Sequence, residues 1–330
     1  MARPKVFVTR ILAQEALDRI SQATDMEVWT GEMPPSYEAF VEKARDVDGL
    51  LTLVTERVDA GLMAAAPRLK VISNVGVGYD NVSVAEATKR HIFVGNTPGI
   101  LNETTADFAF ALLMAAARRV VEADGYTRSG KWKTWGPQTL LGLDIHHATL
   151  GIVGLGRIGS EVAKRARGFD MRVLYHTRTR RSEATEKQLG VEYVPELGQL
   201  LAASDFVSLH VPLTPETRHL IGAPQFALMK PTAVFVNASR GPVVDQKALY
   251  QALKARRIFA AATDVTEVEP VSMDDPLLTL DNLIITPHIG SGSVETRKKM
   301  MLMAADNLLA GVRGEPLPYC VNPEARAGGN

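Results

Sequence analysis

Cysteine is almost absent from this chain, which has one, Cys320, among 330 residues. A single thiol cannot form an internal disulfide or a multi-thiolate metal site, and such a composition is typical of proteins from reducing compartments. Net charge is absent as well, because 37 Lys and Arg balance 37 Asp and Glu. Since proteins bind nucleic-acid backbones through clustered positive charge, we expect no nucleic-acid partner.

Long hydrophobic runs are also missing. The most apolar stretch, residues 106–117, contains Asp107 and is shorter than the roughly 20 residues that cross a bilayer. Residues 1–9 lead directly into a strand-like run, without the apolar core or the cleavage site of a signal peptide. We therefore expect a cytoplasmic protein that does not associate with a membrane.

The residues that are present alternate between short β-branched runs and longer helical patterns. This alternation predicts an α/β protein with parallel sheets, and at roughly 150 residues per domain the length predicts about two domains. The predicted strands form two series, 5–9, 26–29, 49–54, 71–75 and 93–96, and then 150–154, 172–177, 206–211, 233–238, 261–265 and 283–286.

A turn signal at residues 96–99 (NTPG) separates the two series, and a long helical pattern follows it. The last helical pattern, residues 294–311, has no strand after it and can pack back on the first domain. We therefore predict a discontinuous domain, 1–101 with 291–330, and a dinucleotide-binding domain at 102–290.

The second series opens with a G-x-G-x-x-G motif directly after its first strand. Gly154 permits a tight turn, Gly156 lets the backbone approach a pyrophosphate, and Gly159 lets the next helix pack closely. The motif alone is a weak signal, but its place between a strand and a helix favours dinucleotide binding. The expected contacts are Gly154, Leu155, Gly156, Arg157, Ile158 and Gly159.

The next strand lacks the acidic residue that binds the ribose hydroxyls of NAD. The chain continues instead with polar and basic residues at 177–181 (TRTRR), and the first acid after them is Glu183. Arg178 and Arg181, with Thr177, are suited to a 2′-phosphate. We therefore predict NADP(H) as the preferred cofactor, with NAD(H) as the alternative; a merely solvated basic loop is the competing interpretation.

Three residues that suit oxoacid reduction lie just beyond predicted strands of the second series: Arg240, Glu269 and His288. Ligands of parallel sheets bind beyond the carboxyl ends of the strands. Arg240 can bind a carboxylate through its planar fork, His288 can donate a proton, and Glu269 can favour the imidazolium. Taken singly, each has a structural explanation: a strand cap, a loop hydrogen bond or a solvated acid.

The other six histidines are weaker candidates, and His219 lies in a helical pattern. None has metal-ligand spacing with cysteines or carboxylates, so we predict no metal.

Five motifs together carry a resemblance to the D-isomer-specific 2-hydroxyacid dehydrogenase family over nearly the whole chain, and within it to glyoxylate/hydroxypyruvate reductases, including the type that reduces 2-ketogluconate. The motifs lie at residues 75–81 (VGVGYDN), 154–159 (GLGRIG), 237–241 (NASRG), 264–270 (DVTEVEP) and 287–291 (PHIGS). In this combination they are highly specific. One departure is Thr266, where many family members have Phe, and it leaves the preferred oxoacid open.

The resemblance implies a flavodoxin-like substrate domain, a Rossmann domain, and an active site in the cleft between them. It implies a homodimer in which Trp135 of the partner subunit reaches the site. The implied substrate contacts are Leu53, Val77, Gly78, Arg240, His288 and Ser291. Further expected cofactor contacts are Val211, Pro212, Thr217, Ala238, Ser239, Asp264 and Gly290.

The activity implied is NADPH-dependent reduction of glyoxylate and hydroxypyruvate, with 2-ketogluconate as a further substrate. Two alternatives stay open: an NAD-linked D-2-hydroxyacid dehydrogenase of other specificity, and a dinucleotide-sensing, corepressor-like interaction protein. Because a fold is shared by many functions, the substrate rests on resemblance rather than on a derived contact.

Overall fold

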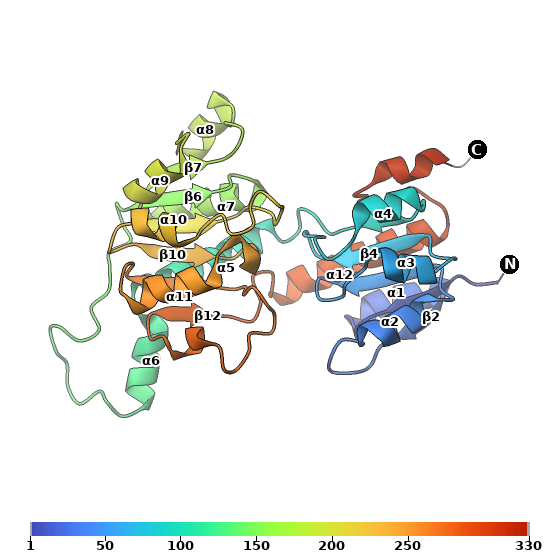
Figure 1. The fold of residues 1–330 in the computed structure, drawn as a ribbon, viewed down its shortest axis with the longest axis horizontal. Coiled ribbons are helices and arrows are strands. Elements are labelled where there is room, and N and C mark those ends of the chain that lie inside the picture. Colours follow the sequence, from blue (N-terminus) through green and yellow to red (C-terminus); the bar gives the residue numbers. More distant parts are fainter. Residues whose placement is uncertain (1, 329–330) are drawn as a thin grey trace. The chain divides into compact units, whose positions relative to one another are not determined.

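The computed structural model describes residues 2–328, and the chain forms two compact α/β units in it (Figure 1). The split unit contains the residues up to Leu101 together with those from Ser293 onward. The central unit is Asn102–Gly292. Each unit is built around one parallel sheet.

The sheet of the split unit has the strand order β2-β1-β3-β4-β5, which is the flavodoxin-like order. Its strands are β1 (Lys5–Val8), β2 (Asp25–Val28), β3 (Gly49–Leu53), β4 (Val71–Val75) and β5 (Phe93–Gly95). Its helices are α1 (Gln14–Ala23), α2 (Tyr37–Ala44), α3 (Ala60–Ala65), α4 (Val84–Lys89) and α12 (Val294–Val312), followed by a 3₁₀ turn at Pro323–Gly328.

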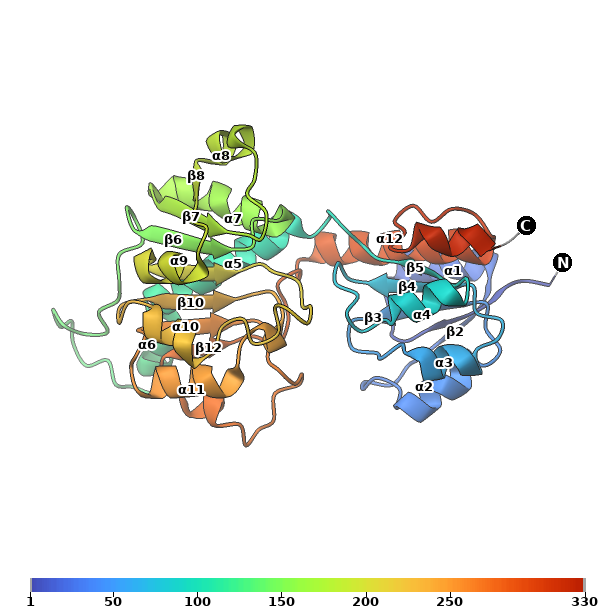
Figure 2. The ribbon, with the colours of Figure 1, turned by 45° about the horizontal axis from the view of Figure 1, so that its top comes forward.

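Helices cover both faces of this sheet (Figure 2). Successive side chains of a strand point to opposite faces. On β4, the buried Ile72 packs in the core formed with α2 and α3, which includes Phe40 and Leu62. Its neighbour Ser73 points the other way and donates a 2.8 Å hydrogen bond to the carbonyl of Ala304 in α12. The helix α12 thus covers the face of the sheet opposite to α2 and α3.

The sheet of the central unit has the order β12-β11-β10-β9-β6-β7-β8. Its strands are β6 (Thr149–Val153), β7 (Arg172–His176), β8 (Val191–Tyr193), β9 (Phe206–Leu209), β10 (Val234–Asn237), β11 (Ala260–Thr263) and β12 (Leu283–Ile285). From β8 to β11 this is the Rossmann order, and β6 and β9 flank the switch point at which ligands bind. The predicted fold class, α/β with a Rossmann and a flavodoxin-like domain, is confirmed.

Helices of the central unit also lie on both faces of the sheet, over two separate hydrophobic cores. They are α5 (Asn102–Ala117), α6 (Val120–Arg128), α7 (Arg157–Ala166), α8 (Glu183–Leu189), α9 (Leu197–Ala203), α10 (Ala223–Leu228) and α11 (Gln246–Lys254). Three 3₁₀ turns are Arg167–Phe169, Gly241–Val243 and Pro276–Thr279. Within residues 2–328, none of the helices combines the length and apolarity that a bilayer crossing requires.

The observed elements differ from the predicted ones mainly at their ends. The strand predicted to reach residue 211 stops at Leu209, and the one predicted to reach residue 265 stops at Thr263. The short strand β8 is not predicted at all, because three residues at a sheet edge carry too little of the period-2 pattern. The earlier strand ends lengthen the loops in which the candidate site residues lie.

Candidate active site

The glycine loop, residues 154–159, connects β6 to α7 at the switch point. Gly154 has a φ of +98°, a left-handed conformation that favours glycine. A Cβ at Gly159 would lie 2.2 Å from the Gly154 carbonyl oxygen, so α7 packs directly on the turn. These two glycines are therefore required by the protein's own packing.

Gly156 is different, because a Cβ there would meet no atom of residues 2–328 within 4 Å. Gly156 is the N-cap of the ten-residue helix α7, and no side chain caps this helix end. Uncapped N–H groups at a helix N-terminus, beside open space, suit a phosphate. The loop therefore fits the pyrophosphate of a dinucleotide, and this fit accounts for a glycine that packing alone does not require.

The basic loop, residues 177–181, is tied to the glycine loop by Arg181. Its guanidinium donates hydrogen bonds of 2.9 and 2.8 Å to the carbonyl oxygen of Leu155. Arg178 is exposed in the same loop, and the Thr177 hydroxyl donates to the Thr179 carbonyl at 2.8 Å. Positive charge thus lies beside the glycine loop, where the sequence predicts it.

Arg180, the remaining arginine of this loop, is neutralised by Glu186 of α8. The guanidinium donates two hydrogen bonds, of 2.9 and 2.8 Å, to that carboxylate. With the Tyr175 hydroxyl, which donates to Glu186 Oε1 at 2.6 Å, it lowers the pKa of Glu186 to about 2. Burial and the same hydrogen bond raise the pKa of Tyr175 to about 12. The positive charge of Arg180 is therefore paired with Glu186, so we do not assign Arg180 to the cofactor.

The loop after β9, residues 210–221, begins with a histidine that the sequence does not assign a role. The His210 N–H donates to the Val153 carbonyl at 2.8 Å, and its Nε2 lies 2.8 Å from the Ser208 hydroxyl oxygen. Burial lowers the pKa of His210 to about 4. At neutral pH the imidazole is therefore uncharged beside the glycine loop.

Farther along this β9 loop, the Thr217 hydroxyl donates to the Pro212 carbonyl at 2.6 Å and accepts from the Thr214 N–H at 2.8 Å. Two predicted cofactor contacts, Pro212 and Thr217, thus close one turn. The helical pattern predicted around His219 is wrong: the residue lies in a turn and has a φ of +52°. The Pro at position 215 and the left-handed residue interrupt the helix.

Arg240, Glu269 and His288 follow the ends of three adjacent parallel strands. Asn237 at the end of β10 pairs with Thr263 of β11, which pairs with Ile285 of β12. The carboxyl ends of these strands therefore meet at one edge of the sheet, and the loops after them share that edge. This arrangement is the one that the sequence predicts.

Glu269 and His288 are in direct contact. Glu269 Oε2 lies 2.7 Å from His288 Nδ1, and the side chains are 33% and 31% exposed, respectively. Glu269 Oε1 accepts the N–H of Thr266 at 3.2 Å. Each carboxylate oxygen therefore has its own donor, and the ring of His288 is oriented by the bond at Nδ1.

Asp264 holds the histidine loop, residues 286–290. This 2%-exposed carboxylate accepts the N–H groups of Ile289 and Gly290 at 2.8 and 2.6 Å and the Thr286 hydroxyl at 2.7 Å. The Asp264 carbonyl accepts the N–H of His288 at 2.9 Å. His288 has a φ of +54°, which costs of order 1 kcal/mol or more. The bonds to Asp264 offset this cost.

Arg240 lies in the turn between β10 and the 3₁₀ turn Gly241–Val243. Its carbonyl accepts the Asn237 side-chain amide at 3.0 Å, and its guanidinium donates to the Ser239 carbonyl at 2.9 Å. A Cβ at Gly241 would lie 1.8 Å from the Thr266 carbonyl oxygen. The backbone that follows Arg240 is therefore pressed against the loop that carries Glu269.

In the split unit, the predicted substrate residues Val77 and Gly78 lie in the loop after β4. Their carbonyls accept the side-chain amides of Asn96 and Asn74, each at 2.9 Å. Among residues 2–328, the N–H groups of Val77 and Gly78 donate to no protein acceptor. Two backbone donors are therefore available to an anion.

The third predicted residue of this unit, Leu53, ends β3. Its carbonyl accepts from Asn81, and its N–H donates at 2.6 Å to the buried Glu56. The sequence does not single out the asparagines or Glu56, because their importance lies in contacts between loops.

The segment 129–143 contains exposed tryptophans. Trp132 and Trp135 are 61% and 79% exposed, and the preceding helix α6 exposes Val120 and Val121. Ser291, the remaining predicted substrate contact, is half-buried after the histidine loop. Within the described part of the chain, no group of three His, Cys, Asp or Glu side chains is placed to hold a metal ion.

A model of a known protein family matches most of the central unit. The model of "D-isomer specific 2-hydroxyacid dehydrogenase, NAD binding domain" matches residues 110–290. A glyoxylate reductase from Korarchaeum cryptofilum is 56% identical over 323 residues, covering 98% of this chain and 97% of the relative. One from Aeropyrum pernix is 49% identical over 328 residues, with the same coverage of 98% and 97%.

Solved structures give the same picture. A protein from Thermus thermophilus matches with a TM-score of 0.90 at 44% identity, covering 96% of this chain and 99% of that one. The NADPH-dependent glyoxylate/hydroxypyruvate reductase from Sinorhizobium meliloti, solved with NADP and malonate, matches with a TM-score of 0.87 at 33% identity, covering 98% of each chain.

Proposed function

The chain belongs to the D-isomer specific 2-hydroxyacid dehydrogenase family, and from this premise we propose that it is an NADPH-preferring reductase of small 2-oxoacids. The substrates are glyoxylate, giving glycolate, and hydroxypyruvate, giving D-glycerate, with 2-ketogluconate as a further candidate. The observation that carries this proposal is the 2.7 Å contact between Glu269 and His288 at the sheet edge next to Arg240. The relatives from Korarchaeum and Aeropyrum are named glyoxylate reductases, which supports glyoxylate as a substrate.

The cofactor is assigned to the glycine loop and the basic loop. The uncapped N-terminus of α7 binds the pyrophosphate at Gly156, and Arg178 and Arg181, with Thr177, bind the 2′-phosphate. A bound reduced nicotinamide supplies the hydride for the keto carbon. The other predicted contacts, in the β9 loop and beyond β10 to β12, complete the assignment: Val211, Pro212, Thr217, Ala238, Ser239, Asp264 and Gly290.

The chain's own residues hold the oxoacid and supply the proton. The Arg240 guanidinium and the N–H groups of Val77 and Gly78 bind the carboxylate. His288 donates a proton from Nε2 to the carbonyl oxygen, since its Nδ1 is bound to Glu269. The contact with Glu269 fixes the orientation of the His288 ring. Leu53 and Ser291 line the substrate pocket.

We assign the exposed tryptophan segment to a homodimer. Two tryptophans that are 61% and 79% exposed lie in it, and exposed apolar clusters of this kind are typical of protein interfaces. Trp135 then contacts the substrate bound by the partner subunit. The single cysteine supports a cytoplasmic location.

The test is a steady-state comparison of glyoxylate, hydroxypyruvate and 2-ketogluconate with NADPH and NADH. We expect kcat/KM for glyoxylate to be at least tenfold higher with NADPH. Arg178→Ala, which leaves the bonds from Arg181 to Leu155 intact, should lose most of this preference because it removes one charge from the 2′-phosphate.

Arg172→Ala is the matched control, because Arg172 is an exposed arginine at the opposite end of β7 and pairs with Glu192. Its cofactor preference should equal that of the wild type. Equal losses with both cofactors in Arg178→Ala would contradict the 2′-phosphate assignment, and no reduction of any of the three oxoacids would contradict the proposed function.

A further inference from the structure

A second histidine–carboxylate pair lies in the same part of the central unit as the first. His219 Nε2 lies 2.7 Å from Glu267 Oε1, and the two side chains are 47% and 32% exposed. His219 belongs to the β9 loop, and Glu267 belongs to the acid loop, residues 264–270, which carries Glu269. This pair has no part in the chemistry proposed above.

Glu267 is also held by Gln246, the first residue of α11. The Glu267 N–H donates to Gln246 Oε1 at 2.9 Å, and the Gln246 N–H donates to Glu267 Oε1 at 3.3 Å. Gln246 Nε2 donates in turn to Asp275 at 2.7 Å. The backbone and the carboxylate of Glu267 are therefore both fixed from one helix end.

His219 is fixed from its own side of the contact. Its N–H donates to the Pro242 carbonyl at 2.8 Å, and the N–H of Ile221 donates to the Val243 carbonyl at 3.2 Å. In the opposite direction, the N–H of Asp245 donates to the Ile221 carbonyl at 2.9 Å. The left-handed φ of +52° at His219 is thus maintained by a backbone ladder to the segment that follows Arg240.

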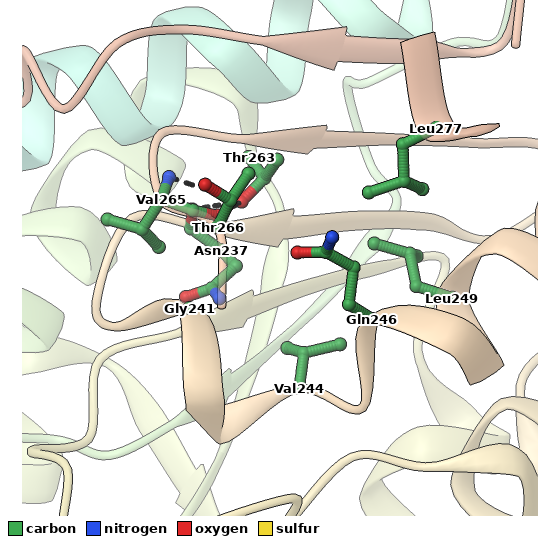
Figure 3. Close-up of a pocket in the computed structure, with 9 residues that line it drawn as sticks. All are labelled: Asn237, Gly241, Val244, Gln246, Leu249, Thr263, Val265, Thr266 and Leu277. Carbon is green, nitrogen blue, oxygen red and sulfur yellow. Dashed lines mark hydrogen bonds between the residues drawn. The ribbon is translucent and has the colours of Figure 1, made fainter. Parts of the chain in front are cut away.

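Apolar packing beneath the acid loop is incomplete. A small cavity of about 10 Å³, which is room for about one water molecule, lies there. Figure 3 shows the side chains around it. Its lining includes Gly241, Gln246, Thr266 and the apolar Leu249 and Leu277. Beside this cavity, the N–H of Glu267 donates to Gln246 and the N–H of Thr266 donates to Glu269.

The loop has little freedom on the side of Arg240. The close approach of Gly241 to the Thr266 carbonyl means that a shift of the loop in that direction displaces the turn after Arg240. The N–H of Thr266 is also the donor to Glu269 Oε1. A movement of Thr266 and Glu267 therefore changes the position of Glu269 relative to His288.

We propose that His219, Glu267 and Gln246 are positioning residues that hold the acid loop where Glu269 meets His288. This inference rests on the proposed function for its catalytic consequence. The contact between His219 and Glu267 joins the loop assigned to the cofactor, through Pro212 and Thr217, to the loop that supports the proton donor. The pair thus links these two loops directly.

The experiment compares His219→Leu with His219→Gln, whose side-chain amide can still donate to Glu267. Lys230→Met is the matched control. Lys230 and Asp205 form a 2.8 Å ion pair of similar exposure, 37% and 34%, near the amino ends of β9 and β10. Glu267→Gln is measured alongside as a milder disruption that keeps the side-chain size. The readouts are amide hydrogen exchange of residues 264–270 by mass spectrometry and kcat with glyoxylate and NADPH.

We expect His219→Leu to raise the exchange rate of this segment at least tenfold and to lower kcat about tenfold, with the KM for glyoxylate within twofold. His219→Gln should recover most of both effects, and Lys230→Met should show neither. In a Glu269→Gln background, His219→Leu should change kcat less than twofold, since both changes act on the same contact.

Unchanged exchange in both His219→Leu and Glu267→Gln would overturn the inference, and so would faster exchange with an unaltered kcat. A full additional tenfold loss in the Glu269→Gln background would also overturn it. A wild type that reduces no oxoacid would contradict the proposed function alone, because the exchange comparison would still decide whether the pair holds the acid loop.

Discussion

The hydrogen bonds of Glu269 and Asp264 distinguish the roles of these two acids beyond the strand ends. Glu269 uses one oxygen for His288 Nδ1 and the other for the Thr266 N–H, so the carboxylate is oriented at both ends. Asp264 uses its carboxylate for the backbone of the histidine loop. Of these two acids, Glu269 is the one whose carboxylate contacts the imidazole.

Glu269→Gln should therefore slow oxoacid reduction. The amide keeps the size of the side chain, but it replaces the carboxylate that contacts His288 Nδ1. We expect kcat with glyoxylate and saturating NADPH to fall about tenfold, while Glu192→Gln, the surface control, keeps the wild-type rate. An unchanged kcat would remove Glu269 from this role.

His210 makes a separate prediction about stability and pH. Burial lowers its pKa from 6.5 to about 4, so the unfolded chain binds this proton more readily than the folded one. Above pH 6.5 the ring is neutral in both states, and the protein keeps its full stability. As the pH falls from 6.5 toward 4, protonation of the unfolded chain lowers the free energy of unfolding. From about 1.4 kcal/mol per pKa unit, the loss is roughly 2 to 3 kcal/mol.

Urea unfolding at pH 7 and pH 4.5 tests this prediction. The free energy of unfolding of the wild type should fall by about 2 kcal/mol more between these pH values than that of His210→Asn, which has no titrating ring. Equal decreases in the two proteins would show that His210 does not titrate in this way.

Secondary-structure elements determine where these residues meet. Alternating apolar patterns predict β10, β11 and β12, and the parallel arrangement then predicts that Arg240, Glu269 and His288 share a sheet edge. The pairing of Arg180 with Glu186 is not predictable in the same way, because it depends on how α8 packs beside the basic loop. The turn at His219 is likewise stabilised by a distant carbonyl, that of Pro242.

The junction of β6 and α7 gives a matched pair of substitutions. Gly159→Ala places a methyl group 2.2 Å from the Gly154 carbonyl oxygen. In the described part of the chain, the methyl group of Gly156→Ala has no neighbour within 4 Å. Gly159→Ala should therefore lose about 1 to 3 kcal/mol of stability, and Gly156→Ala should lose little. Because its methyl group enters the space assigned to the pyrophosphate, Gly156→Ala should instead weaken NADPH binding at least tenfold.

Thermal denaturation and NADPH fluorescence titration measure the two effects separately. Gly156→Ala with normal stability and normal NADPH affinity would contradict the placement of the pyrophosphate.

For the molecule as a whole, the five motifs carry the resemblance to the family. The match to residues 110–290 and the curated relatives confirm it, together with the expectation of an enzyme. Strand periodicity also predicts both sheets. The available N–H groups of Val77 and Gly78 are not visible in the sequence, since they depend on where Asn74 and Asn96 direct their amides. The preferred oxoacid is not predictable either, because Thr266 replaces an aromatic residue common in the family.

Single-turnover oxidation of NADPH on mixing with glyoxylate tests the central claim most directly, when the wild type is compared with His288→Gln. The variant keeps a polar side chain of similar size but has no acidic proton to donate at neutral pH. We predict that its rate falls at least 100-fold, with an unchanged affinity for NADPH. A rate within threefold of the wild type would contradict the assignment of His288 as the proton donor.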